Sequence, residues 1–305
     1  MHKSVLLEEC IDNLKLQDTS VVVDATLGYG GHSSEILKRV SNGFLYAFDQ
    51  DQEAINYSDK RLSKIASNYE IIKSNFEFMQ KELNQRNIHE VDGILFDLGV
   101  SSPQLDEKDR GFSFHKDAPL DMRMDKEQSL SAKEVVNTYS MEELIRIFRE
   151  YGEEKFATSI AKGIVAYREK KEIETTLELV EIIKENVPER YRREKHPARK
   201  VFQAIRIEVN RELDVCNDAV RQALKLIKVG GRVCVITFHS LEDRLVKNIF
   251  REVSEVDKNL KGLPIIPEEY LPSYKLVANI EPSKIELDEN NRARSARLRV
   301  IERIK

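Results

Sequence analysis

Three aspartates at the ends of short apolar runs are the residues of this sequence whose types and spacing could do chemistry. Asp24, Asp49 and Asp97 each close a run of β-branched and aromatic residues that is predicted to form a buried strand. Ligands of open parallel sheets bind beyond the carboxyl ends of the strands. Acids at three strand ends therefore predict a ligand site at one edge of a sheet.

A glycine-rich loop, Gly28-Tyr29-Gly30-Gly31-His32, follows the first of these acids. Glycines allow a tight turn and let the backbone approach a bulky ligand without a Cβ clash. Asp49, about twenty residues further on, can accept hydrogen bonds from both ribose hydroxyls of a nucleoside. A dinucleotide-binding loop would need glycine at position 33, where this chain has Ser33. These features fit a methyltransferase, a nicotinamide-dependent dehydrogenase or another α/β nucleotide-binding protein.

The elements that must position these residues alternate between strand and helix in the first third of the chain. Such alternation predicts a parallel sheet covered by helices on both faces. The predicted strands are Val21–Ala25, Gly43–Phe48, Tyr69–Lys73, Val91–Phe96 and Gly231–Phe238, with an antiparallel edge pair at Tyr274–Asn279 and Ala296–Ile304.

Residues 106–199 interrupt this pattern, because they show helical periodicity and no convincing buried strand. Ser131 and Glu134 have the spacing of a capping box at the start of one of these helices. The fold class predicted is α/β: a Rossmann-like domain of residues 1–105 and 200–305, interrupted by an all-helical insertion of residues 106–199.

The composition and the spacing of cysteines and histidines indicate which class of protein this chain belongs to. The chain has 305 residues, 41% of them hydrophobic, and no apolar run of transmembrane length, so we expect a globular protein without a membrane span. Cys10, Cys216 and Cys234 lie far apart, and no histidine pair has ligand spacing. We therefore expect no metal, no disulfide and a cytoplasmic location.

Two segments are basic although the net charge is −4. Residues 188–211 contain eight Lys or Arg against three acids, and residues 290–305 contain six against one. Such segments suit a nucleic-acid-binding face, although an exposed helix or tail can have the same composition. Arg292 and Arg294 are candidate RNA contacts in the second segment.

In the first basic segment, Arg199, Phe202 and Arg206 share a helical face through their i, i+3 and i+7 spacing. An arginine–aromatic–arginine stripe suits phosphate contact together with base stacking on RNA. A packing face between domains with a salt-bridged edge would show the same pattern.

Long motifs run from His2 to Arg299: HKSVLL, DATLGYGGHS, DLGVSSPQLD, RGFSF, PLDMRMD, HPARKVFQAIRIEVN, FHSLEDR and NRARSARLR. In these motifs the chain resembles the bacterial 16S ribosomal RNA (cytosine-N4)-methyltransferase family, RsmH or MraW. Tyr29 and the pair Arg199-Lys200 are small departures from the family pattern. The resemblance implies a class I methyltransferase that uses S-adenosylmethionine and recognises RNA with its helical insertion. It also implies the substrate, the N4 amine of a cytidine in the P-site region of 16S rRNA in the small ribosomal subunit.

Residue by residue, the resemblance implies cofactor contacts at Gly30, Gly31, His32, Asp49, Phe76, Asp97 and Gln104. Phe76 can form a wall for the adenine ring, although most phenylalanines are simply buried. For catalysis we expect Asp97 near the charged end of the cofactor. Ser102, or a main-chain carbonyl of its loop, would accept a hydrogen bond from the target amine, although serine there can instead cap a turn.

Three other residues have open roles. His239 can orient RNA or cofactor, or be structural, and Asp121 and Arg123 can close over the site or pin the insertion to the sheet. Two other functions remain: an RNA-binding assembly protein with a vestigial cofactor fold, and a small-molecule N-methyltransferase. Intact Asp49 and Asp97 argue against the first, and the basic segments argue against the second.

Overall fold

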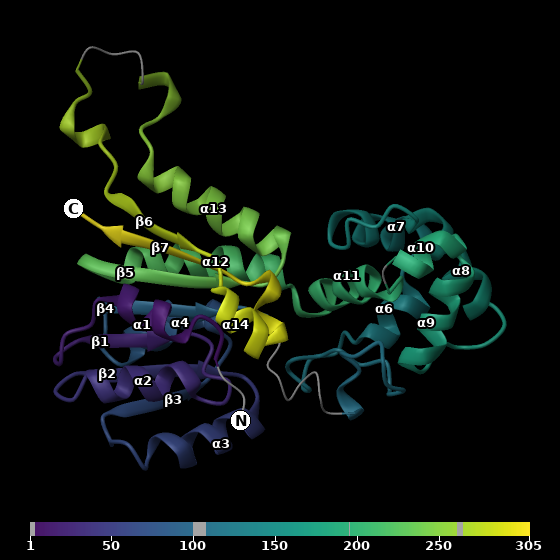
Figure 1. Ribbon diagram of the computed structural model, residues 1–305, viewed down its shortest axis with the longest axis horizontal. Helices are drawn as coiled ribbons and strands as arrows, with labels where there is room; N and C mark the ends of the chain where they lie inside the picture. Colours follow the sequence, from purple (N-terminus) through teal and green to yellow (C-terminus); the bar gives the residue numbers. More distant parts are fainter. Residues whose placement is uncertain (1–3, 100–107, 195, 261–264) are drawn as a thin grey trace. The chain divides into compact units, whose positions relative to one another are not determined.

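The computed structural model describes residues 4–99, 108–194, 196–260 and 265–305, which form two compact units (Figure 1). The sheet unit comprises residues 1–99 and 213–305, and the helical unit comprises residues 100–212. None of the helices formed by the described residues is long and apolar enough to cross a membrane.

The described residues of the sheet unit build a seven-stranded sheet with the strand order β3-β2-β1-β4-β5-β7-β6. Strands β1 to β5 are parallel, and β7 runs antiparallel between β5 and β6. The predicted parallel sheet with an antiparallel pair at one end is thus confirmed. The strands are β1 Val21–Asp24, β2 Phe44–Asp49, β3 Tyr69–Lys73, β4 Val91–Asp97, β5 Ile227–Thr237, β6 Tyr274–Ile280 and β7 Arg297–Arg303.

Helices cover both faces of the sheet, because successive strand residues point to opposite sides. Val23 belongs to a core shared with α4, α12 and α13, whereas Val22 belongs to a core shared with α1, α2, α3 and α14. The helices are α1 Leu7–Leu14, α2 Gly31–Arg39, α3 Gln52–Leu62, α4 Met79–Gln85, α12 Glu212–Leu226, α13 Ser240–Ser254 and α14 Lys284–Glu289.

Strand β5 is longer than the sequence predicts. It begins at Ile227, whereas the predicted strand begins at Gly231, so the glycine pair Gly230-Gly231 lies inside the strand. The β4–β5 register shifts between Val91 and Gly93, and Gly230 has a positive φ of 83°. A bulge takes up extra residues without ending a strand, and this is why a glycine pair typical of turns does not end this one.

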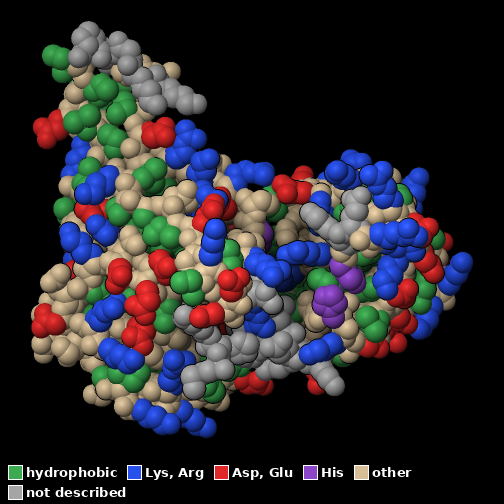
Figure 2. Space-filling view, viewed as in Figure 1, with side chains coloured by type: hydrophobic (Ala, Val, Ile, Leu, Met, Phe, Trp, Pro, Cys, Tyr) green, Lys and Arg blue, Asp and Glu red, His purple; other side chains and the backbone are tan. Residues whose placement is uncertain are grey.

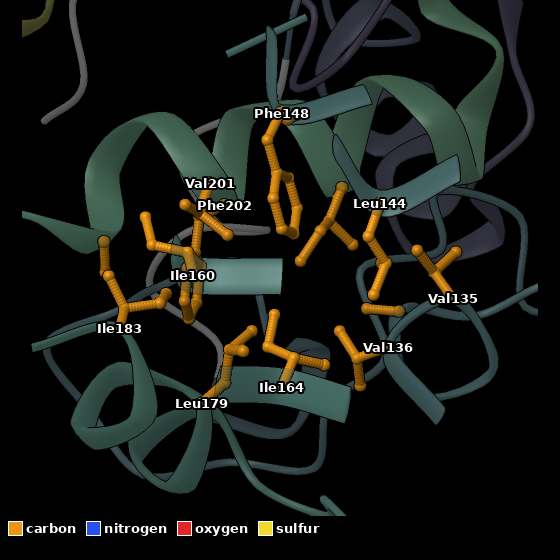
Figure 3. Close-up of a cluster of buried hydrophobic side chains, with 14 of the residues drawn as sticks. Val135, Val136, Leu144, Phe148, Ile160, Ile164, Leu179, Ile183, Val201 and Phe202 are labelled. Carbon is orange, nitrogen blue, oxygen red and sulfur yellow. The ribbon is translucent and has the colours of Figure 1, made fainter. Parts of the chain in front are cut away.

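The helical unit packs its described helices around one apolar core, which Figure 3 shows in close-up. Ser131, Ser140 and Thr175 each start a helix with a capping box, as predicted for the first of them. The helices are α6 Ala132–Thr138, α7 Met141–Glu150, α8 Ala157–Arg168, α9 Thr176–Glu185, α10 Glu189–Glu194 and α11 Ala198–Asn210.

Helix α11 corrects the expected domain boundary. Its Ala198, Val201 and Ile205 are buried in the helical core with residues of α6, α7 and α9. The chain therefore passes to the sheet unit after Glu212 and not after residue 199. An amphipathic pattern shows that a helix has a buried face, but it does not show which core that face packs against.

Candidate cofactor site

The three aspartates singled out in the sequence end strands β1, β2 and β4, which are neighbours in the order β2-β1-β4. All three strands are parallel, so their carboxyl ends lie at one edge of the sheet. Two loop contacts join these ends. The N–H of Asp97 donates to Thr26 Oγ1 at 2.6 Å, and the N–H of Gly28 donates to Asp49 Oδ2 at 2.8 Å.

The glycine loop is enclosed on two sides. Gly30 has a φ of 71°, which favours glycine, and a Cβ there would lie 3.1 Å from Ser58 Oγ. A Cβ on Gly31 would lie only 1.9 Å from Ser4 Oγ. Ser58 Oγ also donates to the carbonyl of Gly28 at 2.7 Å. Packing from α3 and from the N-terminal segment therefore explains two of the loop's glycines.

Asp49 accepts one main-chain hydrogen bond on each carboxylate oxygen. Gly28 donates to Oδ2 and Asp51 donates to Oδ1, both at 2.8 Å. Burial raises the pKa of Asp49 to about 6, although main-chain hydrogen bonds from Asp51, Gly28 and Gln50 lower it. A carboxylate oxygen can accept two hydrogen bonds, so the carboxylate as a whole can accept more than its main-chain bonds. The geometry suits a pair of ribose hydroxyls.

Asp97 is an acid without a counter-charge. Its Oδ1 is buried and has no hydrogen-bond partner among the described residues. Burial raises the pKa of Asp97 to about 8, and the nearby acids Asp24 and Glu242 add to the effect. A buried carboxylate needs a cationic partner or a proton. This site therefore suits a positively charged group of a ligand.

His32 lies beside this acid but does not neutralise it. Its side chain is 5% exposed, and its Nδ1 lies 3.6 Å from Asp97 Oδ2. Nε2 donates to the carbonyl of Val5 at 3.2 Å, which assigns the ring proton to Nε2. Burial lowers the pKa of His32 to about 4, so the ring is neutral at pH 7.

Asp24 differs from the other two acids because residues of the loop already donate hydrogen bonds to both of its carboxylate oxygens. Ser33 Oγ donates to Oδ2 at 2.6 Å, and the N–H of Thr26 donates to Oδ1 at 3.1 Å. Asp24 is buried, and burial raises its pKa. Ser33, which breaks the dinucleotide-binding pattern, thus holds an acid that shapes the loop. Sequence reasoning missed the roles of Ser33 and Thr26, because the residue types alone do not show which groups donate to Asp24.

Phe76 starts the 3₁₀ turn η1, Phe76–Phe78, after β3. Its ring is half-buried and meets Phe96 edge-on with centroids 5.8 Å apart. Asn75 Nδ2 donates to Gln50 Oε1 at 3.3 Å, which joins this turn to the residue after Asp49. Phe76 is therefore held beside the end of β2 with part of its surface accessible. Ser102 and Gln104 lie outside the described residues.

His239 is the N-cap of α13. Its Nδ1 accepts from the N–H of Glu242, and the Oε2 of Glu242 accepts from the N–H of Phe238 at 2.8 Å. Nε2 of His239 lies 3.1 Å from Glu242 Oε1. These contacts give His239 a capping role, one of the alternatives that the sequence left open.

Asp121 and Arg123 pair with each other inside the helical unit. The guanidinium donates from Nε and Nη2 to the two carboxylate oxygens at 2.8 and 2.9 Å, and from Nη1 to the carbonyl of Gln128. The guanidinium lowers the pKa of Asp121, although burial of the carboxyl opposes this effect. The pair stabilises its own loop.

The proposed RNA-contact residues fall into different environments. Phe202 is 3% exposed and belongs to the helical core, so the predicted stacking role for its ring is wrong. Arg206 donates to both carboxylate oxygens of Glu212 at 2.7 and 2.9 Å. Arg199 and Arg294 are exposed, and Arg292 is half-buried.

Several solved structures are similar to this chain. An rRNA methylase from Streptococcus thermophilus is 13% identical with a TM-score of 0.46, and the match covers 100% of this chain and 99% of that one. A protein from Streptococcus mutans in complex with SAH is 12% identical with a TM-score of 0.45, with 99% of each chain covered. A SAM-dependent O-methyltransferase from Thermotoga maritima is 10% identical with a TM-score of 0.42, covering 100% of this chain and 68% of that one.

The MraW methylase family matches residues 1–304. This match extends over both units and includes every strand end described above. The chain therefore belongs to the MraW methylase family and is a class I methyltransferase that uses S-adenosylmethionine.

Proposed function

We propose that this methyltransferase modifies the N4 amine of a cytidine in the P-site region of 16S ribosomal RNA, within the small ribosomal subunit. Family membership gives methyl transfer. The RNA and the target atom are supported by the motifs that run from His2 to Arg299 and by the two basic segments. Exposed Arg199 and Arg294 are the proposed phosphate contacts, and Arg292 belongs to the same turn as Arg294.

The burial of the cysteines is the observation that favours an exocyclic amine over a ring carbon. Methylation at cytosine C5 requires a protein thiolate that adds to C6. Cys10, Cys216 and Cys234 are all buried. Burial raises the pKa of Cys10 well above its usual range and that of Cys234 to about 12. None of these thiols is available as a nucleophile, and attack by an amine needs no covalent protein intermediate.

The cofactor site fits S-adenosylmethionine. Bound there, this cofactor supplies a methyl group on a positively charged sulfur. Asp49 would accept the ribose hydroxyls on the free acceptor positions of its carboxylate. Asp97, with its unpartnered buried Oδ1, would hold the cationic amino-acid end. Gly30 and Gly31 would contact the cofactor through the main chain of their loop, and Phe76 would contact the adenine.

The target amine needs an acceptor that orients its lone pair toward the methyl group. We assign this role to Ser102 or to a main-chain carbonyl of the same loop, in keeping with the sequence DLGVSSPQLD. The variant Ser102→Ala distinguishes the hydroxyl from a main-chain carbonyl. If the hydroxyl is the acceptor, the variant should have a lower kcat with little change in KM. An unchanged kcat would assign the role to the main chain.

Radiolabelled S-adenosylmethionine, incubated with 16S rRNA, with small subunits and with small-molecule amines, tests the proposal. We expect label in the RNA and N4-methylcytidine in its nuclease digest by mass spectrometry. Asp97→Asn should remove the label and serves as the control. 5-Methylcytidine, or a protein adduct trapped on RNA that contains 5-fluorocytidine, would refute the amine mechanism. RNA binding without transfer would favour an assembly role, and transfer to small amines alone would favour a small-molecule enzyme.

A further inference from the structure

Three aromatic side chains lie against one another in the helical unit. The rings of Phe114 and His196 are stacked, with centroids 4.5 Å apart and an interplanar angle of 29°. His115 lies 4.4 Å from Phe114 and 5.2 Å from His196, with an edge-on arrangement to the latter. Phe114 also meets the buried ring of Phe202 edge-on at 5.7 Å. Phe114, His115 and His196 are called the imidazole platform below.

The imidazole platform reaches solvent. His115 is exposed, and Phe114 and His196 are half-buried. Figure 2 shows histidine side chains on the surface of the helical unit with Lys and Arg side chains around them. The platform thus has a firm base in the core and an accessible aromatic surface, which an ordinary core cluster does not have.

His196 behaves as an uncharged aromatic ring. Burial lowers its pKa, and the nearby His115 and Lys184 lower it further. Its Nδ1 is buried without a hydrogen-bond partner among the described residues. Neither histidine belongs to a group of three metal-ligating side chains in the part of the chain that the structure describes. These observations favour a stacking surface over a cation or a metal site.

Two cationic side chains border the platform. Lys116 directly follows His115 and is exposed. Arg199 is also exposed, and its N–H donates to the carbonyl of His196 at 3.2 Å, so it lies one turn away on α11. Neither forms an ion pair with any side chain that the structure describes. An aromatic surface beside free cations is the combination that binds unpaired RNA.

We propose that the imidazole platform binds an unpaired nucleobase of the RNA substrate by stacking, with Lys116 and Arg199 on the flanking phosphates. This inference rests on the proposed function, and it names a base-contact site in place of Phe202. Stacking tolerates any base because each has a flat π surface. The platform therefore contributes affinity for single strands and no strong sequence preference.

The test is the affinity of the full chain for a short fluorescein-labelled oligocytidine, measured by anisotropy for His115→Ala, His196→Ala and His196→Phe. We expect each alanine variant to bind roughly fivefold to tenfold more weakly, as for the loss of part of a base stack. His196→Phe keeps the ring and should bind like wild type. The exposed His89→Ala, in the sheet unit, is the matched control.

Three companion measurements separate stacking from a structural role. Binding of a duplex RNA should be unchanged in all variants, since paired bases cannot stack on the platform. The salt slope should be unchanged, because no phosphate contact is removed. Affinity for S-adenosylmethionine should stay at the wild-type value, which shows that the sheet unit is intact.

Wild-type affinity of both alanine variants for oligocytidine would overturn the platform while leaving RNA methylation intact. Equal losses for His196→Phe and His196→Ala would also overturn it, because the ring would then be irrelevant. A wild-type protein that neither binds oligocytidine nor methylates rRNA would overturn the platform and the proposed function together.

Discussion

The main-chain N–H of Gly28 donates to Oδ2 of Asp49 at 2.8 Å, so the acid at the end of β2 is tied to the loop that follows β1. The same carboxylate accepts from the N–H of Asp51 at 2.8 Å. Asp49 thus shapes the glycine loop and also faces the position proposed for the ribose. A substitution of Asp49 therefore affects the loop as well as the proposed ribose contact.

Asp49→Asn should weaken S-adenosylmethionine binding roughly 10-fold to 150-fold, the loss of one hydrogen bond to the carboxylate, and Asp49→Ala should abolish it. The carboxylate is expected to accept two hydrogen bonds worth about 1.5–3 kcal/mol each, and asparagine keeps only one acceptor oxygen. Calorimetric titration measures the affinity. Asp59→Asn, an exposed acid of α3 that bonds to Tyr69, is the control. Near-wild-type affinity in a folded Asp49 variant would contradict the ribose assignment.

Cofactor affinity should increase as pH rises from about 6 to about 8 and then level off. Burial raises the pKa of Asp97 to about 8 in the ligand-free protein, so this carboxyl carries a proton at pH 7. A cationic ligand favours the ionised form, and binding therefore releases a proton in this range. Calorimetric titrations of the protein with S-adenosylmethionine, in two buffers of different ionisation enthalpy, measure how many protons are released on binding. Equal apparent enthalpies in both buffers would show that Asp97 does not ionise on binding.

Asp97→Asn should stabilise the ligand-free protein at alkaline pH. Because the folded pKa is above the unfolded value, the native state of the wild type loses stability as pH rises from about 4 to about 8. The variant lacks this loss. At about 1.4 kcal/mol per pKa unit the full shift corresponds to about 5–6 kcal/mol, and because the side chain is 28% exposed, solvent screening reduces the expected advantage of the variant to about 2 kcal/mol above pH 8. Urea unfolding of both proteins at about pH 4 and above pH 8 measures the difference in the free energy of unfolding. A difference that is independent of pH would refute the assignment.

Arg199→Ala and Arg294→Ala should each lower the salt slope of RNA binding by about 0.7 to 0.9. Both side chains are exposed. Arg206→Ala is the contrasting variant, since its guanidinium is paired with Glu212, and it should leave the slope unchanged. Affinity measured over a series of salt concentrations gives the slopes. Unchanged salt slopes for the Arg199 and Arg294 variants would show that neither basic segment contacts RNA phosphates.

Phe202→Ala should cost about 3–5 kcal/mol of folding free energy, the range for removing a buried aromatic side chain. The ring is 3% exposed and packs in the core of the helical unit. Denaturant unfolding measures the loss, with exposed Lys116→Ala as the control of little effect. A Phe202→Ala variant whose free energy of unfolding equals that of the wild type would contradict the core role of this ring.

The sequence alone determined the sheet and the edge at which its strand-end acids lie. Asp24, Asp49 and Asp97 close predicted strands that are neighbours in the structure. This could be predicted because strand direction and the residue at each strand end are properties of short segments. The glycine loop could also be predicted from the sequence. A positive φ such as that of Gly30 is a local backbone property that favours glycine.

Only the tertiary structure decided what each of these residues does. Asp24 is satisfied by Ser33 and Thr26, whereas Asp97 keeps an unpartnered oxygen, yet the sequence presents both as strand-end acids. Helical periodicity placed Phe202 on the same stripe as two arginines, and packing against the helical core took its ring out of solvent. A short pattern encodes which way a side chain points along its own element. The partners that satisfy, pair or cover that side chain belong to other segments or loops, near or far along the chain, and they meet it only when the chain folds.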